Sequence, residues 1–243
     1  MRVTDDATPT IVIVDDDESV RRALRRQLTT AGYNVEAYAT AAELLQRGPV
    51  QGPGCLILDV RMPEISGLQL RDSLWPLGHS QPVVFMTGYG DLETGVRAMK
   101  TGAVDYLTKP FGEAALLEAI ERALQRDAAA RHEQEALAVL QSRYLTLTRR
   151  EREVCRLVAD GRLNKQIAAV LGTSEKTIKV HRARVMRKMC VASVAELVRA
   201  VDRLARGREQ SDDAPGDTST SPAPHDEVRE QPREQPTDFG EAR

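Results

Sequence analysis

Short β-branched runs alternate with longer helix-period stretches over the first half of the chain. Apolar runs occur at residues 10–14, 33–38, 55–60, 83–87 and 103–107, and helical spacing follows each of them, at 19–30, 41–46, 67–75, 91–100 and from 113 onward. Most of the runs are apolar throughout, which is typical of parallel strands buried on both faces. The pattern predicts a doubly wound α/β domain with a five-stranded parallel sheet.

The second half shows only helical patterns. No helix breaker interrupts the stretch from 113 to about 141, so we expect one continuous helix that docks on the sheet at its start and serves as a linker or dimerisation rod at its end. Four further helices are predicted at 148–159, 164–171, 174–189 and 193–205. Thr148 with Glu151 forms a capping-box pattern, and Gly161 and Gly172 fit helix stops. The sequence therefore predicts an all-α four-helix module joined to the sheet domain by a long helix.

Composition divides the chain into four parts. We expect an α/β domain at 9–125, a helical linker at 126–141, the helical module at 142–208 and an acidic tail at 209–243. The tail is rich in Pro, Ser, Thr, Gln and acidic residues and contains no Leu or Ile, so no core offsets the entropy of ordering it. We expect the tail to be disordered.

The net charge of −2 over 243 residues hides a strong asymmetry. Residues 9–125 hold 11 Lys and Arg against 15 Asp and Glu, residues 142–208 hold 17 against 6, and residues 209–243 hold 3 against 10. A basic segment between acidic ones indicates nucleic-acid binding confined to one domain.

Other classes of protein are excluded by the same composition. The longest apolar runs are far shorter than the roughly 20 residues that span a bilayer, and no export signal is recognisable, so we expect a cytoplasmic protein with no membrane contact. The three cysteines are widely spaced and form no Cys/His cluster, which argues against disulfides and structural zinc.

Polar side chains follow four of the predicted strands at one edge of the sheet. Asp15 and Asp16 follow the first strand, Asp59 the third, Thr87 the fourth and Lys109 the fifth. Ligands of doubly wound sheets bind at this edge, where the strand order reverses. Three carboxylates there need positive charge, which Mg²⁺ and the lysine would supply. The set suits an aspartate nucleophile that attacks a phosphoryl group, because the metal, the lysine and the threonine hydroxyl stabilise the transferring oxygens.

Three segments around these residues, IVIVDDDESVRRAL, LILDVRMPEISGLQL and VVFMTGYGDLETGVRAMKTGAVDYLTKPF, resemble the flavodoxin-like receiver domain of two-component response regulators. The resemblance implies Asp59 as phosphoacceptor and a sensor histidine kinase as the phosphate donor. It also implies a set of Mg²⁺ ligands and a group that senses the phosphate. The ligands would be Asp15, Asp16, Asp59 and the backbone carbonyl of Arg61; the sensing group would be Thr87 and Lys109, with Tyr106 as the switch aromatic and a cis bond before Pro110. Asp17 should begin the first helix.

Each of these residues also has an ordinary explanation as a helix cap, a turn residue or a packed aromatic. What favours a site is their order, with 43 residues from Asp16 to Asp59, 28 more to Thr87 and 22 more to Lys109, each at a strand end. A phosphatase of the haloacid-dehalogenase kind is the enzymatic alternative. That family resembles DxDx(T/V), whereas position 61 here is Arg, and no P-loop is present, so we expect no enzyme beyond self-phosphorylation and self-dephosphorylation.

In the basic module, residues 164–189 have the spacing of a helix-turn-helix. On the second helix Ile178, Val185 and Met189 share the core stripe. The opposite face offers small apolar groups between cations, a surface suited to the major groove of double-stranded DNA. We expect the DNA contacts to come from Lys176, Lys179, Val180, Ala183, Arg184 and Arg187. A solvated basic face, or an adaptor that docks acidic protein, is the alternative.

The segment LTRREREVCRLVADGRLNKQIAAVLGTSEKTIKVHRARVMRKM resembles the DNA-binding domain of the NarL/LuxR family, closest to its FixJ branch. In that family the counterparts of Lys179 and Val180 face bases. Together the two resemblances imply a response regulator transcription factor that binds promoter DNA as a phosphorylation-dependent homodimer. His181 is expected to be a partly buried helix residue and not a metal ligand.

Overall fold

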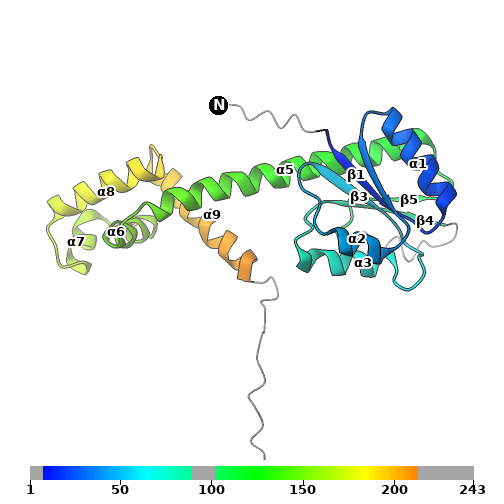
Figure 1. Cartoon of the computed structure of the whole chain (residues 1–243). Coiled ribbons are helices and arrows are strands. Elements are labelled where there is room, and N and C mark those ends of the chain that lie inside the picture. The colour runs from blue at the N-terminus through cyan, green and yellow to red at the C-terminus, as the bar shows by residue number, and fades with distance from the viewer. Residues whose placement is uncertain (1–7, 89–101, 213–243) are drawn as a thin grey trace, which may run out of the picture.

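The computed structural model describes residues 8–88 and 102–212, and it begins with a parallel five-stranded sheet (Figure 1). The strands lie in the order β2-β1-β3-β4-β5, so the winding reverses direction between β1 and β3. Every neighbouring pair is parallel, which confirms the predicted doubly wound fold. The strands are β1 (Thr10–Val14), β2 (Asn34–Tyr38), β3 (Gly54–Asp59), β4 (Val83–Thr87) and β5 (Asp105–Thr108).

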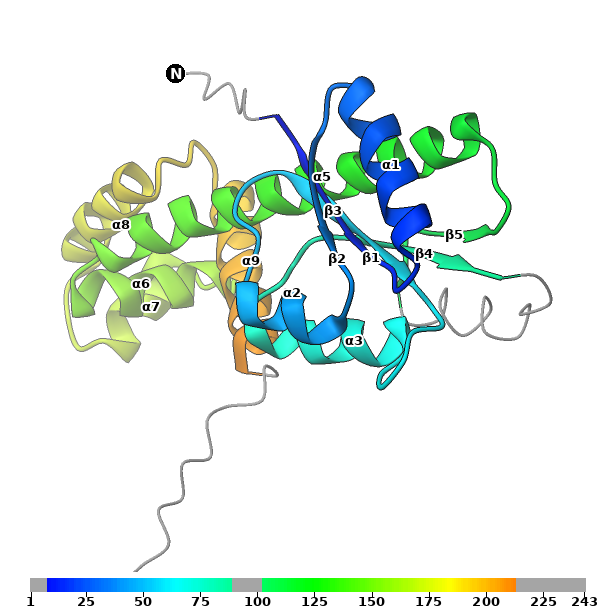
Figure 2. The ribbon, with the colours of Figure 1, turned by 45° about the vertical axis from the view of Figure 1, so that its right-hand side comes forward.

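Helices cover both faces of the sheet and bury two separate apolar cores (Figure 2). On one face α2 (Ala41–Arg47) and α3 (Gly67–Leu74), which a short 3₁₀ helix η1 (Trp75–Leu77) extends, pack on alternate residues of the strands. On the other face lie α1 (Glu18–Thr30) and the start of α5 (Glu113–Leu145). Burial on both faces explains why the strands read as continuous apolar runs.

Local signals place the helix ends close to where the sequence predicts them. Asp17 caps α1 by accepting hydrogen bonds from the backbone N–H groups of Ser19 and Val20, as expected. The observed bounds of the strands and helices in this domain differ from the predicted ones by at most two residues. The helix predicted at 91–100 lies outside the described residues.

Helix α5 is the continuous helix that the sequence predicts, and it runs on to Leu145. At its start Leu116 and Ile120 are buried in the core beneath the sheet. At its end Tyr144 is buried among the following helices, and Leu137 and Leu140 pack against the same core. The end of the helix is therefore part of the second domain as well as a connection to it.

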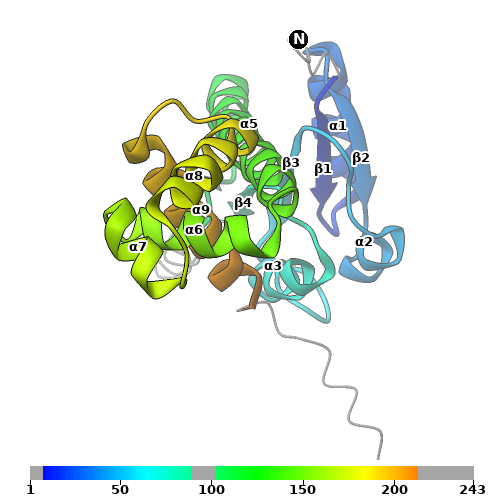
Figure 3. The same cartoon turned by 90° about the vertical axis from the view of Figure 1, so that its left-hand side faces the viewer.

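The second domain consists of helices only, wrapped around the end of α5 (Figure 3). Its elements are α6 (Arg149–Ala159), α7 (Asn164–Val170), α8 (Glu175–Met189) and α9 (Val194–Asp212). The predicted capping box of Thr148 and Glu151 is present, and Gly161 and Gly172 have positive φ. These features confirm the four-helix module.

The last helix is longer than the sequence predicts. We expected it to end at Ala205 and residues 209–243 to be disordered, yet α9 continues to Asp212. The residues between contain no proline, and the buried Gly207 lies against Leu137 of α5, so the helix continues past Leu204. The remainder of the predicted tail lies outside the described residues. Within residues 8–88 and 102–212, no helix has both the length and the apolar character needed to cross a membrane.

Candidate functional site

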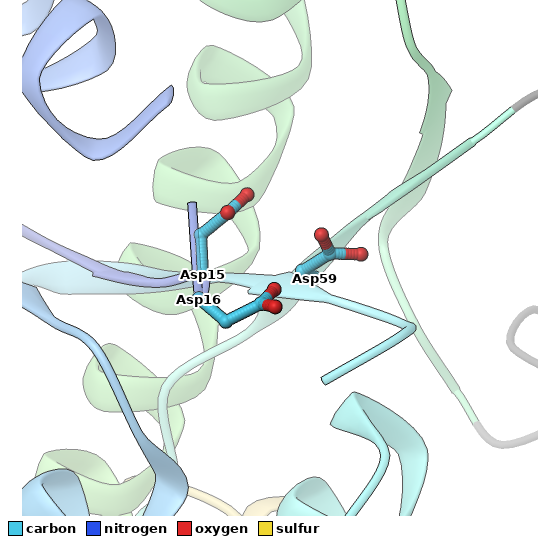
Figure 4. Close-up of side chains that lie close together, drawn as sticks. All are labelled: Asp15, Asp16 and Asp59. Carbon is cyan, nitrogen blue, oxygen red and sulfur yellow. The ribbon is translucent and has the colours of Figure 1, made fainter. Parts of the chain in front are cut away.

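The register of the sheet gathers the predicted strand-end residues at one edge. Val14 pairs with Leu58, so the next residues along the two strands, Asp15 and Asp59, lie side by side at the point where the winding reverses. Figure 4 shows their side chains together with that of Asp16 at the ends of β1 and β3. Each of the three aspartates offers a carboxylate oxygen within 4.8 Å of the other two.

The two inner carboxylates are held from several directions. Asp15 is fully buried, and its Oδ1 accepts the backbone N–H of Asp17 at 2.9 Å. Asp59 Oδ1 accepts the backbone N–H of Arg61 at 3.0 Å. Burial raises the pKa of Asp15 above its ordinary value, although the hydrogen bonds from Lys109 and Asp17 oppose this rise. Burial thus makes an ionised carboxylate at Asp15 costly, and positive charge beside it would offset that cost.

Lys109 supplies the positive charge at this edge. Its Nζ lies 2.6 Å from Asp15 Oδ2 and 2.6 Å from Asp59 Oδ2. Burial lowers the pKa of the lysine, but the two carboxylates outweigh burial, so the net shift is upward and the amine stays charged. The backbone N–H of Lys109 also bonds to Thr87 O at 2.6 Å, which fixes the lysine to the end of β4.

The remaining receiver-like residues occupy distinct positions. The Thr87 side chain is fully buried at the end of β4, and its hydroxyl has no hydrogen-bond partner within the described parts of the chain. Tyr106 lies on β5 opposite Phe85 and is half-buried against the core on the α2 and α3 face. The bond between Lys109 and Pro110 is cis, as the resemblance implied.

The chemistry of this edge fits a hard divalent cation. The acidic set supplies only oxygen ligands, which Mg²⁺ prefers, and the exposed Asp16 leaves a side open to solvent. A buried hydroxyl with no partner and an ammonium, at the ends of adjoining strands, would both bind an oxyanion held at Asp59. The arrangement can therefore bind an oxyanion and a cation together.

Two residues that support the site were not identified from the sequence. Arg21 Nη1 donates to the backbone oxygen of Asp15 at 2.7 Å and so supports the loop after β1. Gly67 begins α3 so close to the backbone carbonyl of Asp59 that a Cβ at that position would collide with it. The glycine could have been suspected only from its place eight residues after an acidic strand end, which is a weak signal.

The basic helix α8 is a well-defined element. Ser174 caps it through the backbone N–H of Thr177 at 3.1 Å, and Cys190 ends it in the left-handed conformation. Ile178, Val185 and Met189 are fully buried, so the predicted core stripe is confirmed. Its opposite face is therefore turned to solvent.

All of the predicted DNA-contact side chains lie on that exposed face. Val180 remains 47% exposed although it is apolar, which packing within this chain does not explain. Lys179 makes a loose ion pair with Glu175 at 3.8 Å. The exposed set is Lys176, Lys179, Val180, Ala183, Arg184 and Arg187. His181 is half-buried, as expected.

Side-chain bonds attach α8 to the rest of its domain. Lys188 Nζ lies 2.6 Å from Glu151 Oε2, and the same carboxylate oxygen accepts the backbone N–H of Thr148 at 2.9 Å. Arg182 Nη1 bonds to Asn164 Oδ1 at 3.1 Å and so joins α8 to the start of α7. These contacts come from the sides of α8 and leave its cationic face free of them. These bonds fix the position of α8 within its domain, and its exposed cationic face is available to a DNA groove.

Comparison with known families agrees with both halves of this description. Residues 11–121 match the model of the response regulator receiver domain. Residues 145–201 match the model of the bacterial regulatory proteins of the luxR family.

Several known proteins align with this chain over most of its length. Nodulation protein W of Bradyrhizobium diazoefficiens is 44% identical over 83% of this chain and 89% of its own length. The transcriptional regulatory protein FixJ of Azorhizobium caulinodans is 42% identical over 83% of this chain and 95% of its own. The solved structure of the response regulator StyR is similar with a TM-score of 0.69 and 45% identity, and the match covers 81% of this chain and all of that one.

Proposed function

The chain belongs to the NarL/LuxR family of response regulators, transcription factors in which a receiver domain precedes a LuxR-type DNA-binding domain, and from this premise we propose that phosphorylation of Asp59 controls how tightly α8 binds promoter DNA. The observation that carries the proposal is the position of Asp59. Its carboxylate is nearly buried between two other aspartates and the Lys109 ammonium, at the reversal point of the sheet.

The phosphoryl group would come from a phosphohistidine of a sensor kinase. An oxygen of Asp59 forms the new P–O bond while the P–N bond to the donor imidazole breaks, and the imidazole nitrogen takes up a proton. Asp15, Asp16, Asp59 and the Arg61 carbonyl would hold Mg²⁺, which when bound neutralises the phosphoryl oxygens. Lys109 supplies a second positive charge to the same oxygens.

Thr87 would couple phosphorylation of Asp59 to a change in the receiver domain. Its buried hydroxyl, which has no partner among the described residues, would donate to a phosphoryl oxygen, so phosphorylation replaces an unsatisfied polar group by a hydrogen bond. Movement of the end of β4 toward the phosphate and an inward turn of Tyr106 would then alter the region near residues 91–112, of which 91–101 lie outside the described residues. We propose that this surface mediates dimerisation or release of the DNA-binding domain.

No separate substrate is needed for this function. Slow loss of phosphate from Asp59 would be hydrolysis of the protein's own acyl phosphate, and we infer no turnover of another molecule. The Arg at position 61, where the phosphatase motif has a second aspartate, supports a signal carrier over a phosphatase. We expect the protein to act in the cytoplasm, beside the DNA that it regulates.

The experiment measures the affinity of the full-length protein for a duplex selected from a randomised pool, with and without acetyl phosphate and Mg²⁺. We expect the phosphodonor to tighten binding of the wild type and to leave Asp59→Asn unchanged. Asp72→Asn, which removes an exposed aspartate of α3, is the matched control and should respond like the wild type. Equal affinities in the presence and absence of the phosphodonor would reject the switch.

A further inference from the structure

The cationic face of α8 carries positive charge that its surroundings leave largely uncompensated. Its four exposed cations are Lys176, Lys179, Arg184 and Arg187. Glu175 is the only acidic residue of the helix, and it pairs loosely with Lys179, at 3.8 Å. The other three cations make no ion pair with any residue that the structure describes. Such a face attracts a segment of opposite charge.

Other cations of the helical domain are paired or lie beside acidic residues. The pairs are Arg149 and Arg150 with Glu153, Lys188 with Glu151, and Arg203 with Glu133. On α9 the exposed Arg199 and Arg206 lie one helical turn to either side of the exposed Asp202. Among the described residues, Glu175 alone provides compensation of this kind on the cationic face of α8.

The receiver domain does not cover this face. Figure 1 shows α8 at the end of the molecule remote from the sheet, with the length of α5 between them. The side-chain bonds that hold α8 in its own domain come from Arg182 and Lys188, which do not belong to the face. The face is therefore open to an anionic segment as well as to DNA.

A segment of this kind follows α9 in the chain. Residues 213–243 lie outside the described residues, and their sequence holds 8 Asp and Glu against 3 Arg, which gives a net charge of −5. The segment contains no lysine, and its only large apolar residues are Val228 and Phe239. Charge is therefore its main means of recognition, and the sign is opposite to that of the α8 face.

The segment is long enough to reach α8. Helix α9 begins four residues after α8 ends, and its 19 residues span about 28 Å. The 31 residues beyond α9 extend over at most about 100 Å, and they would span about 46 Å even as one helix. Both lengths exceed that of α9, so the segment can return along α9 to the nearer end of α8 and, when extended, pass along its whole face.

We propose that the acidic segment 213–243 occupies the cationic face of α8 in the free protein and competes there with DNA. The proposal rests on the proposed function of α8 as the DNA-binding helix. Single contacts between exposed charges are weak, but covalent attachment holds the segment near the face at an effective concentration on the order of 1 mM. At that concentration a segment whose own Kd for the face is about 0.5 mM weakens DNA binding about threefold by competition.

The first test measures the affinity of the full-length protein for the selected duplex at low and high salt. One variant has all eight acidic residues of 213–243 changed to the corresponding amides. The matched variant has Arg229, Arg233 and Arg243 changed to Gln, which makes the segment more acidic. We expect the amide variant to bind about three- to tenfold more tightly than the wild type at low salt and the matched variant to bind more weakly. The differences should vanish as salt screens the charges.

A second measurement separates occupation of α8 from a general repulsion of DNA by the acidic segment. Cys190 is exposed at the end of α8, whereas burial raises the pKa of the Cys55 and Cys155 thiols. A thiol-reactive spin label therefore attaches selectively at Cys190. In the ¹⁵N-labelled protein we expect this label to broaden the amide resonances of residues 213–243, and we expect duplex DNA to reduce the broadening.

Matched double variants test which cations hold the segment. Arg184→Gln with Arg187→Gln removes charge from the face and should reduce the broadening. Arg199→Gln with Arg206→Gln removes exposed arginines of α9, which lie nearer to the segment in sequence, and should leave the broadening unchanged.

Several outcomes would overturn the proposal. Equal broadening in the wild type and both double variants would mean that the segment does not use the charge of α8. Equal DNA affinities of the wild type and the amide variant at low salt would reject the competition alone. Failure of every form to bind duplex DNA would reject the proposed function of α8 and the competition with it.

Discussion

Lys109 Nζ lies 2.6 Å from Asp59 Oδ2, and to reach it the lysine extends from the end of β5 past the end of β4 to β3. The same ammonium contacts Asp15, which directly follows β1, at an equal distance. One cation, which follows the edge strand β5, therefore bridges the carboxylates at the ends of β1 and β3. An anion that binds at Asp59 must share or displace this ammonium, so we propose that the lysine senses the change of charge.

We expect Lys109→Gln to slow phosphorylation of Asp59 by acetyl phosphate at least about tenfold, because a preorganised charge at developing oxyanions is lost. The phosphorylated fraction is followed by intact-protein mass spectrometry in the presence of Mg²⁺. Lys165→Gln, an exposed lysine of α7, serves as control and should react like the wild type. An unchanged rate in Lys109→Gln would contradict the role given to the lysine.

Thr87→Val removes the buried hydroxyl but keeps the shape of the side chain. Since that hydroxyl has no partner among the described residues, we expect the unphosphorylated variant to be as stable as the wild type or more stable, by up to about 1 kcal/mol. We also expect it to lose the gain in DNA affinity on phosphorylation. Thr87→Ser keeps the hydroxyl and should keep the gain. Urea unfolding tests the expected stability, and DNA titration tests the expected loss of response. A normal gain in DNA affinity when Thr87→Val is phosphorylated would refute the role given to the hydroxyl.

Gly67→Ala tests the close approach of α3 to the acceptor. A Cβ at this position collides with the Asp59 carbonyl, so α3 or the end of β3 must move. We expect a loss of about 1–3 kcal/mol in the free energy of unfolding and slower phosphorylation. Gly112→Ala places its Cβ where no described atom lies within 4 Å and should change neither property by a comparable amount. Equal behaviour of the two variants would show that the contact with Asp59 is unimportant.

The gathering of the acidic edge follows from the sequence because its cause is simple. Parallel strands end at a common edge, and apolar runs fix where each strand ends, so Asp15, Asp59, Thr87 and Lys109 had to meet once five strands were recognised. The helical module could also be predicted from the sequence, because caps such as Thr148 and the core stripe of α8 are local patterns.

What the sequence does not reveal depends on contacts between distant segments. The tight fit at Gly67 and the hydrogen bond from the backbone N–H of Gly54 on β3 to the carboxylate of Asp127 on α5 arise only when helices are placed on the sheet. The length of α9 was underestimated because Gly207, which lies against Leu137 of α5, looks like a helix stop in the sequence. Likewise, no periodicity shows that residues of α3, β4 and α5 line one cavity, so it could not be predicted.

Glu151→Gln tests how α8 is attached to its domain. The hydrogen bond from Lys188 holds the pKa of Glu151 below its ordinary value. A lowered pKa in the folded state means that the ionised carboxylate stabilises the fold above the ordinary glutamate pKa, and that this contribution is lost as the pH falls through the lowered one. We expect the variant to be about 1–3 kcal/mol less stable than the wild type at pH 7 and nearly equal to it in acid.

The control for this pH dependence is Glu153→Gln on the same helix. Glu153 pairs with Arg149 and Arg150 at the surface, where ion pairs contribute little. Urea unfolding of the wild type and both variants is measured across a pH series. The other carboxylates titrate in all three proteins, so the differences between the proteins report on Glu151 and Glu153 alone. A deficit of Glu151→Gln that persists unchanged in acid would mean that charge is not the cause.

Arg184→Ala tests whether α8 faces DNA phosphates. Arg184 is exposed and lies beside the apolar Val180 and Ala183, so in a groove its guanidinium would reach the backbone. Each phosphate contact releases counterions, so we expect weaker binding at every duplex sequence and a decrease of about 0.9 in the slope of log affinity against log salt. Arg206→Ala removes an exposed arginine of α9 and should leave the slope unchanged. Equal slopes for wild type and Arg184→Ala would place the DNA elsewhere on the domain, because the lost charge would then be remote from phosphate.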